Sequence, residues 1–344
     1  MGLCGPYEGK EESVMKNWLG AFVLAAFLAA PVANCQAREP LKLIQSIPMP
    51  GVGGRIDHMS VDLDGRRLFV SALGNNTVEV IDLADGKDID HIQGLKEPQG
   101  VLYVPESNKL FVASGGDGTC RIFDGTNFEL LSTVHFPSDA DDIRYDQDAG
   151  LVYVGYGDGG LAVLSGMTGK DLGRISLPGH PEAFEIGRDG ARIYINVPTK
   201  QEIDVADWAQ HSVVQRWPML KYRANFPMAY DKVQHRLFVV CRRRAVLLVF
   251  DPDSGKILAH LPVVGDADDL YYDSVQKRIY VSGGQGAISV VKQVDADHYQ
   301  GLATIPTASG ARTSLFVPEL KRLYLAVPSR EGSAAEIRVY AVVP

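Results

Sequence analysis

The chain has 344 residues, of which 46% are hydrophobic, and its formal net charge at pH 7 is -8. The hydrophobic share is sufficient for a packed core and excludes disorder as the main state of the chain. The acidic balance, without a block of Lys and Arg residues, argues against a nucleic-acid-binding protein, which typically carries a basic patch.

Residues 1–37 have the pattern of a secretory signal peptide. Lys16 precedes the run 18–30, which is uncharged, mostly apolar and thirteen residues long. A membrane span needs about 20 apolar residues, whereas a run of this length is typical of the core of a signal peptide. Small residues around Ala37 suit cleavage after that position. We therefore expect a mature chain that begins at Arg38 and is exported to the periplasm or the cell exterior.

Other features of this segment leave alternatives for its processing. The charged stretch 8–12 is unusual in a signal peptide, so Met15 is a better start. Cys35 offers attachment as a lipoprotein, although Asn34 fits poorly at the position before a lipidated cysteine. Retention of the segment as an N-terminal anchor is the other alternative. After removal of the signal, no segment is long and apolar enough to predict a membrane span.

From residue 41 onwards, one short pattern recurs seven times: an aliphatic residue, an aromatic residue and a second aliphatic residue. The aromatic residues lie 42, 42, 41, 44, 42 and 44 positions apart, and they are Phe69, Phe111, Tyr153, Tyr194, Phe238, Tyr280 and Tyr324. A fixed period of this size indicates a repeat architecture. Seven occurrences in register predict seven copies of one structural unit.

The pattern within each repeat predicts four short strands separated by turns. In the first repeat, an extended stretch at 59–61 precedes the turn 64–66, and alternation of apolar and polar residues resumes at 78–82 after Asn75-Asn76. A Gly-Lys turn at 86–87 then leads to a last strand. Period-two alternation between turn residues predicts β-strands, and four strands of about five residues with their turns fill about 40 residues. We therefore predict an all-β, seven-bladed β-propeller with four-stranded blades as a single domain over residues 38–344.

Closure of the ring is also predicted from the sequence. After Tyr324 only one clear strand remains, at 336–342, before the sequence ends. The stretch 41–47 precedes the first repeat and has the pattern of one further strand. We expect this N-terminal strand to complete the last blade, because an incomplete blade would expose an unpaired strand edge.

The repeats resemble the YVTN-type β-propeller family, also called YncE-like. The matching segments are Tyr153-Val154, Tyr194-Ile195-Asn196 and Tyr280-Val281-Ser282, each followed by an aliphatic strand that ends near Asp and a Gly-Lys turn. The resemblance covers residues 41–342 and implies the propeller fold. It does not imply a particular function, since such repeats serve many roles.

Equivalent positions near one mouth of the central channel can be located by counting. The innermost strand of a blade lines the channel, and its first residues lie eleven and twelve positions before each aromatic residue. From the first blade to the seventh these pairs are Asp57-His58, Gln99-Gly100, Asp141-Asp142, Glu182-Ala183, Phe226-Pro227, Asp268-Asp269 and Arg312-Thr313. Blades three and six share an Asp-Ala-Asp-Asp sequence, at 139–142 and 266–269.

The polar members of this set are the candidate site residues. We expect binding at the channel mouth to involve five of them: Asp57, His58, Gln99, Glu182 and Arg312. One hypothesis is a metal site formed by His58, Asp142 and Asp269, since His with carboxylates suits Ca²⁺, Mn²⁺ or Zn²⁺ and oxygen ligands favour the harder Ca²⁺. The other interpretation is a polar lining of a water-filled channel, in which Arg312 neutralises Asp268 and Asp57.

Two other polar groups lie outside this set. His180, before Pro181, has the position of a turn residue between two blades. Arg242, Arg243 and Arg244 form a basic run that is expected in a solvated turn of blade five, where an acidic partner would also fit.

These observations favour an exported scaffold that binds a protein or a small-molecule ligand at one face of the channel, as a monomer and without an assigned catalytic residue. The alternative is a metal-assisted hydrolase acting on lactones, in which the ion generates hydroxide and Arg312 stabilises a developing oxyanion. A scaffold for a redox partner is a third hypothesis. Convergence of three or more carboxylate oxygens on one point would favour the enzyme, whereas carboxylates in salt bridges would favour the binder.

Overall fold

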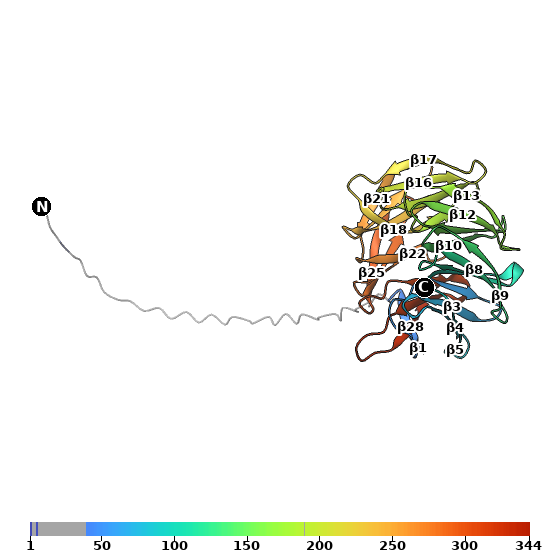
Figure 1. Ribbon diagram of the computed structural model, residues 1–344. Coiled ribbons are helices and arrows are strands. Elements are labelled where there is room, and N and C mark those ends of the chain that lie inside the picture. The colour runs from blue at the N-terminus through green and yellow to red at the C-terminus, as the bar shows by residue number, and fades with distance from the viewer. Residues whose placement is uncertain (2–4, 6–38, 189) are drawn as a thin grey trace. The chain divides into compact units, whose positions relative to one another are not determined.

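The computed structural model describes residues 1, 5, 39–188 and 190–344, so the predicted cleavage site after Ala37 lies outside the described residues. Seven four-stranded antiparallel sheets surround a central channel (Figure 1). The first strand of each sheet contacts the first strand of the next, and the last of these contacts the first. The predicted seven-bladed β-propeller is therefore confirmed.

Blades 1 to 3 follow one another along the chain, and each runs from an inner to an outer strand. Blade 1 consists of β2 (Met59–Asp62), β3 (Arg67–Ala72), β4 (Thr77–Asp82) and β5 (Lys87–Ile92). Blade 2 consists of β6 (Pro98–Val104), β7 (Lys109–Ser114), β8 (Thr119–Asp124) and β9 (Leu130–His135). Blade 3 consists of β10 (Ala140–Asp146), β11 (Leu151–Tyr156), β12 (Gly160–Ser165) and β13 (Asp171–Ser176).

Blades 4 to 6 continue the same order. Blade 4 consists of β14 (Phe184–Ile186), β15 (Arg192–Val197), β16 (Glu202–Asp207) and β17 (Ser212–Pro218). Blade 5 consists of β18 (Arg223–Asp231), β19 (Arg236–Arg243), β20 (Val246–Phe250) and β21 (Ile257–Pro262). Blade 6 consists of β22 (Ala267–Asp273), β23 (Arg278–Gly283), β24 (Ala287–Gln293) and β25 (Tyr299–Pro306).

Blade 7 joins the two ends of the folded chain. It consists of β26 (Ser314–Val317), β27 (Arg322–Val327), β28 (Ala335–Val342) and, as the outer strand, β1 (Leu41–Met49). Leu41 is opposite Val342 and Met49 is opposite Ala335 in this antiparallel pair. The predicted closure by the N-terminal strand is confirmed, with a strand two residues longer than the sequence pattern indicated.

In residues 39–188 and 190–344, helical structure is limited to short turns. The described segments of this kind are the 3-10 turns η1 (Leu73–Asn75), η2 (Pro105–Ser107) and η3 (Pro318–Leu320). Within the described part of the chain, no helix is long and apolar enough to cross a membrane.

The seven aromatic residues of the repeat lie in the second strand of each blade and form the core between blades. None of the seven is more than 4% exposed. Tyr194 of blade 4 packs with Trp217, whose ring stacks on Phe250 of blade 5 at a centroid distance of 6.3 Å. Full burial of a large apolar side chain contributes about 1.5–3 kcal/mol, so the repeated aromatic residue holds each blade against its neighbour.

The inner strands approach one another closely enough to require glycine at one position. A Cβ atom on Gly100 of β6 would lie 2.2 Å from the carbonyl oxygen of Asp141 and 2.8 Å from a side-chain carbon of Ile143, both on the inner strand of blade 3. We therefore expect Gly100→Ala to lower the free energy of unfolding by about 1–3 kcal/mol, because the inner strands would have to separate. Chemical denaturation measures this.

Gly301 of β25 provides the matched control. It lies on an outer strand, and a Cβ atom there would meet nothing within 4 Å. Gly301→Ala is therefore expected to leave the stability unchanged or to raise it slightly, since glycine weakens a strand interior. Equal losses for the two variants would contradict a packing role for Gly100.

Candidate functional site

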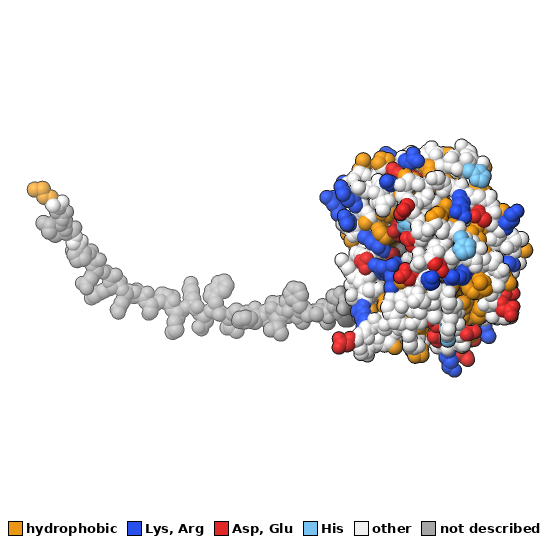
Figure 2. All heavy atoms as spheres, in the orientation of Figure 1, with side chains coloured by type: hydrophobic (Ala, Val, Ile, Leu, Met, Phe, Trp, Pro, Cys, Tyr) orange, Lys and Arg blue, Asp and Glu red, His pale blue; other side chains and the backbone are white. Residues whose placement is uncertain are grey.

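The inner strands of all seven blades enclose a cavity of about 440 Å³, and a second cavity of about 20 Å³ adjoins it at one end. Most of the positions predicted by counting line these two spaces. The larger is lined by His58, Gly100, Asp142, Ala183, Pro227, Asp268 and Asp269, and the smaller adds Asp141, Glu182 and Phe226. Acidic and basic side chains lie next to one another over the middle of the face shown in Figure 2. The repeat therefore locates the channel correctly.

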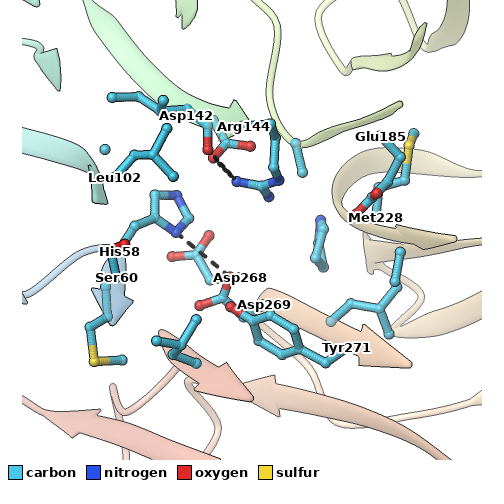
Figure 3. Close-up of a pocket in the computed structure, with 18 of the residues that line it drawn as sticks. His58, Ser60, Leu102, Asp142, Arg144, Glu185, Met228, Asp268, Asp269 and Tyr271 are labelled. Carbon is cyan, nitrogen blue, oxygen red and sulfur yellow. Dashed lines mark hydrogen bonds and ion pairs between the residues drawn. The ribbon is translucent and has the colours of Figure 1, made fainter. Parts of the chain in front are cut away.

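The side chains of His58 and Asp269 point toward each other at the cavity wall (Figure 3). The Nδ1 atom of His58 lies 3.6 Å from Oδ1 of Asp269, and Oδ2 of Asp269 accepts a hydrogen bond of 2.6 Å from the backbone N–H of Ser314. Burial disfavours a charged imidazole, but the carboxylate of Asp269 outweighs burial and raises the pKa of His58 well above its usual value. This pair is a fixed ion pair of the channel wall.

Asp142 pairs with Arg144 of the same strand, β10. Arg144 Nη1 donates hydrogen bonds to Oδ1 of Asp142 and, at 3.0 Å, to the carbonyl oxygen of Ile143. The register of β10 shifts between Ala140 and Ile143, as at an irregularity that re-aims side chains. Asp142 is only 2% exposed, and its Oδ2 atom has no hydrogen-bond partner among the described residues. Burial raises the pKa of Asp142 above its usual value despite the nearby guanidinium.

Two arginines hold Asp268 at the end of the channel. Arg242 donates a hydrogen bond to Asp268 and another, of 2.7 Å, to the carbonyl oxygen of Ala267. Its guanidinium also lies over the Phe226 ring at 3.6 Å. Arg312 Nε lies 2.9 Å from the other carboxylate oxygen of Asp268. The prediction that Arg312 neutralises Asp268 is confirmed.

The prediction of a solvated turn for Arg242 is wrong. Strand β19 extends to Arg243, which places Arg242 on the strand rather than in the turn that follows. The Asp-Ala-Asp-Asp segment of blade 6 provides the partner, since Asp268 lies beside it. Strand β19 therefore ends within the basic run, and Arg242, the first of the three arginines, pairs with Asp268 of the channel wall.

Three predicted binding residues, Asp57, Gln99 and Arg312, do not line either cavity. Asp57 is 1% exposed and forms an ion pair of 2.8 Å with Arg55, which corrects the expected pairing of Asp57 with Arg312. Gln99 donates a hydrogen bond of 2.9 Å to Asp139. The buried side chains of Asp57 and Gln99 support the wall through these polar contacts.

Glu182 lines the smaller cavity next to a His–Asp pair. His180 Nε2 lies 3.4 Å from Oδ2 of Asp141, and its Nδ1–H donates to the carbonyl oxygen of Gly157 at 2.7 Å. Although burial opposes it, the interaction with Asp141 raises the pKa of His180 to about 9. Burial and the negative charge of Asp141 raise the pKa of Glu182 to about 8. His180 lies in the connection between blades 3 and 4, as predicted, and it also pairs with Asp141, which lines the smaller cavity.

The predicted metal ligands do not form a coordination sphere. Among the described residues, no group of three or more His, Cys, Asp or Glu side chains is arranged to hold a metal ion. Asp142 is turned to Arg144, and one oxygen of Asp269 accepts from the backbone N–H of Ser314. The site formed by His58, Asp142 and Asp269 stays a prediction, and these carboxylates are in salt bridges or hydrogen bonds rather than free to converge.

A second layer of cavity residues lies two positions further along each inner strand, and the sequence analysis missed it. Its members are Ser60, Leu102, Arg144, Glu185, Ala229, Tyr271 and Leu315. Since strand side chains alternate, extending the count by two residues would have located all seven. In this layer, burial raises the pKa of Glu185 to about 7, while Tyr271 donates a hydrogen bond of 2.7 Å to the carbonyl oxygen of Ser314.

Comparison with known proteins identifies the fold only. No family model and no curated protein matches the chain. A chain of Kuenenia stuttgartiensis hydrazine synthase is similar in structure at 16% identity, with a TM-score of 0.69 over 84% of this chain and 98% of that chain. A chain in the crystal structure of the mitotic checkpoint complex is similar at 13% identity, with a TM-score of 0.74 over 95% and 100%. At these identities the similarity concerns the propeller scaffold and not its function.

Proposed function

We propose that this protein is an exported β-propeller of the YVTN type that binds a ligand in its central channel and has no catalytic activity of its own. The main support for this proposal is that carboxylates of the channel are paired with arginines. Asp142 is paired with Arg144, and Asp268 with Arg242 and Arg312. Metal-assisted hydrolysis needs several oxygens directed at one ion, and paired carboxylates do not supply them.

The remaining parts of the proposal have separate support. The apolar run 18–30 and the small residues before Arg38 support export, with attachment through Cys35 as the alternative. The motifs around Tyr153 and Tyr280 support membership of the YVTN family. The cavity has a volume of about 440 Å³, within the range of about 300–1,000 Å³ that is typical of small-molecule sites.

Thermal melting with a panel of small organic compounds tests the proposal. The panel contains cationic, anionic, zwitterionic and neutral compounds, and we expect at least one to raise the melting temperature. Leu102→Trp should abolish that shift, because the larger ring occupies the cavity. Glu129→Gln, an exposed position near the outer strand of blade 2, should retain it. Absence of any shift, or equal shifts in both variants, would contradict binding in the channel.

Metal addition separates the binder from the hydrolase. A bound ion stabilises the folded state in proportion to the logarithm of its concentration over its dissociation constant. We expect Ca²⁺, Mn²⁺, Zn²⁺ and a chelator to leave the melting temperature unchanged, and lactones to remain intact. A metal-dependent increase that disappears in Asp142→Asn and Asp269→Asn would instead establish the hydrolase alternative.

A further inference from the structure

The larger cavity contains carboxylate oxygens that lack a hydrogen-bond donor. The Oδ2 atom of Asp142 is buried without a partner, and Asp142 lies on the cavity wall with its carboxylate turned inward beside Arg144 (Figure 3). Glu185 lines the same cavity, and its carboxylate accepts no hydrogen bond from the described residues. A buried acceptor without a donor is costly, by about 1–3 kcal/mol. A ligand that supplies N–H donors would remove this cost.

The charges of the cavity wall also favour a cation. Among the described residues that line the cavity, Asp142, Glu185 and Asp269 are accompanied by two cationic side chains, His58 and Arg144. Asp268 also lines the cavity, but Asp268 and the neighbouring Asp266 are together paired with two arginines, Arg242 and Arg312, so these four charges balance. With all groups ionised, the cavity therefore carries one uncompensated negative charge. A carboxylate or phosphate ligand would add to this charge, whereas a monovalent cation would cancel it.

We infer that the channel cavity binds a small organic cation with a primary ammonium group, held by Asp142 Oδ2 and the carboxylate of Glu185. This inference rests on the proposed function and specifies the class of ligand. An ammonium group carries three N–H donors and no acceptor, which matches a wall whose unsatisfied groups are acceptors.

The remainder of the wall favours an organic ion over a metal ion. Leu102, Ala229 and Leu315 of the second layer supply apolar surface, and the ring of Tyr271 belongs to the same layer. The volume is far larger than a single ion needs, and an alkyl chain of a few carbons would occupy this apolar part. Aromatic rings also attract ammonium groups through their π-electrons.

Binding of a cation is expected to be coupled to release of a proton. Burial is the main cause of the raised pKa of Glu185, and the negative charge of Asp142 raises this pKa further. The positive charges of Arg144 and, more weakly, Lys232 lower it. With a pKa of about 7, it is largely protonated at pH 6. An ammonium ligand favours the ionised form, so binding at pH 6 should release a proton, and binding at pH 8.5 should release almost none.

Isothermal titration calorimetry of the exported protein with n-butylammonium chloride tests the inference. Butyrate and 1-butanol have the same alkyl chain with opposite or no charge, and tetramethylammonium has the charge without N–H donors. We expect butylammonium to bind at least tenfold more tightly than each of these. Titrations at pH 6 in two buffers of different ionisation enthalpy measure the released proton.

Variants of Glu185 assign the binding to this cavity. Glu185→Gln should weaken butylammonium binding at least tenfold, while the control Glu129→Gln should leave it unchanged. Glu185→Lys places an ammonium group on the chain itself, so it should abolish binding and melt at a higher temperature than Glu185→Gln. Butylammonium that binds no better than 1-butanol, or equally well to Glu185→Gln, would overturn the inference.

The outcomes also separate this inference from the proposed function. A ligand of another class that binds and is blocked by Leu102→Trp would leave the channel as a binding site and refute the ammonium assignment. Calcium that binds in place of butylammonium would refute the ammonium assignment and favour the hydrolase alternative. Absence of any ligand sensitive to Leu102→Trp would refute both.

Discussion

A chain that begins at residue 50 is expected to melt far below one that begins at residue 39 and to aggregate during refolding. Strand β1 (Leu41–Met49) pairs along the whole of β28, and Leu41, Ile47 and Met49 are buried in the cores beside blade 7. Its removal exposes this apolar surface and leaves the edge of β28 free to pair with other chains. Thermal melting and light scattering of the two truncated chains measure the effect.

Two isoleucines of β1 give a matched pair for the same prediction. Ile47 is 1% exposed, whereas Ile44, next to the irregularity between Leu43 and Gln45, is 46% exposed. Ile47→Ala should cost about 2–5 kcal/mol of the free energy of unfolding, and Ile44→Ala at most about 0.5 kcal/mol. Similar melting temperatures for the chains beginning at 39 and 50 would show that the ring does not depend on β1.

The free energy of unfolding is expected to fall as the pH rises from about 5 to about 8. Burial raises the pKa of Asp57 and of Glu185 to about 7, and that of Glu182 to about 8. Each value lies above that of the unfolded chain, so the folded state binds more protons in this interval and loses stability as they dissociate. One extra bound proton corresponds to about 1.4 kcal/mol per pH unit.

His180 acts in the same direction, since its pKa is raised to about 9. Asp141 acts in the opposite direction, because its pKa is lowered and its contribution is lost only under acidic conditions, below about pH 4. Urea denaturation at pH 5, 6.5 and 8 measures the dependence. Glu182→Gln and Glu185→Gln should flatten it and be more stable than the wild type at pH 8, while Glu129→Gln should leave it unchanged. Stability that rises with pH over this interval would refute the prediction.

The fold follows from local patterns that a sequence contains directly. The spacing of residues such as Phe69 and Tyr153 specifies seven repeats, and the alternation within each repeat specifies its strands. The single strand after Tyr324 specifies closure by residues near the N-terminus. These inferences succeed because a propeller buries the same position of every blade, and one period therefore determines both the blade and its place in the ring.

Counting along the period also located the channel wall, since equivalent positions of equivalent strands converge on one axis. It did not determine which charged groups pair. Asp57 pairs with the neighbouring Arg55, Asp142 with Arg144 on its own strand, and Asp268 with arginines from the two adjacent blades. Blades 3 and 6 have the same Asp-Ala-Asp-Asp sequence but different partners for it.

The tertiary structure decided these partners for a physical reason. The reach of each arginine determines which carboxylate its guanidinium meets, and the positions of Arg55, Arg144, Arg242 and Arg312 do not recur with the period of the repeat. The register shift itself does recur, in the inner strands β6, β10, β18 and β22. Whether a carboxylate remains ionised depends in turn on its burial and on the summed charge of several blades. The ring and the position of its channel therefore follow from the repeat in the sequence. The charge pattern inside the channel follows only from the folded chain, because pairing across blades depends on side-chain geometry rather than on the repeat.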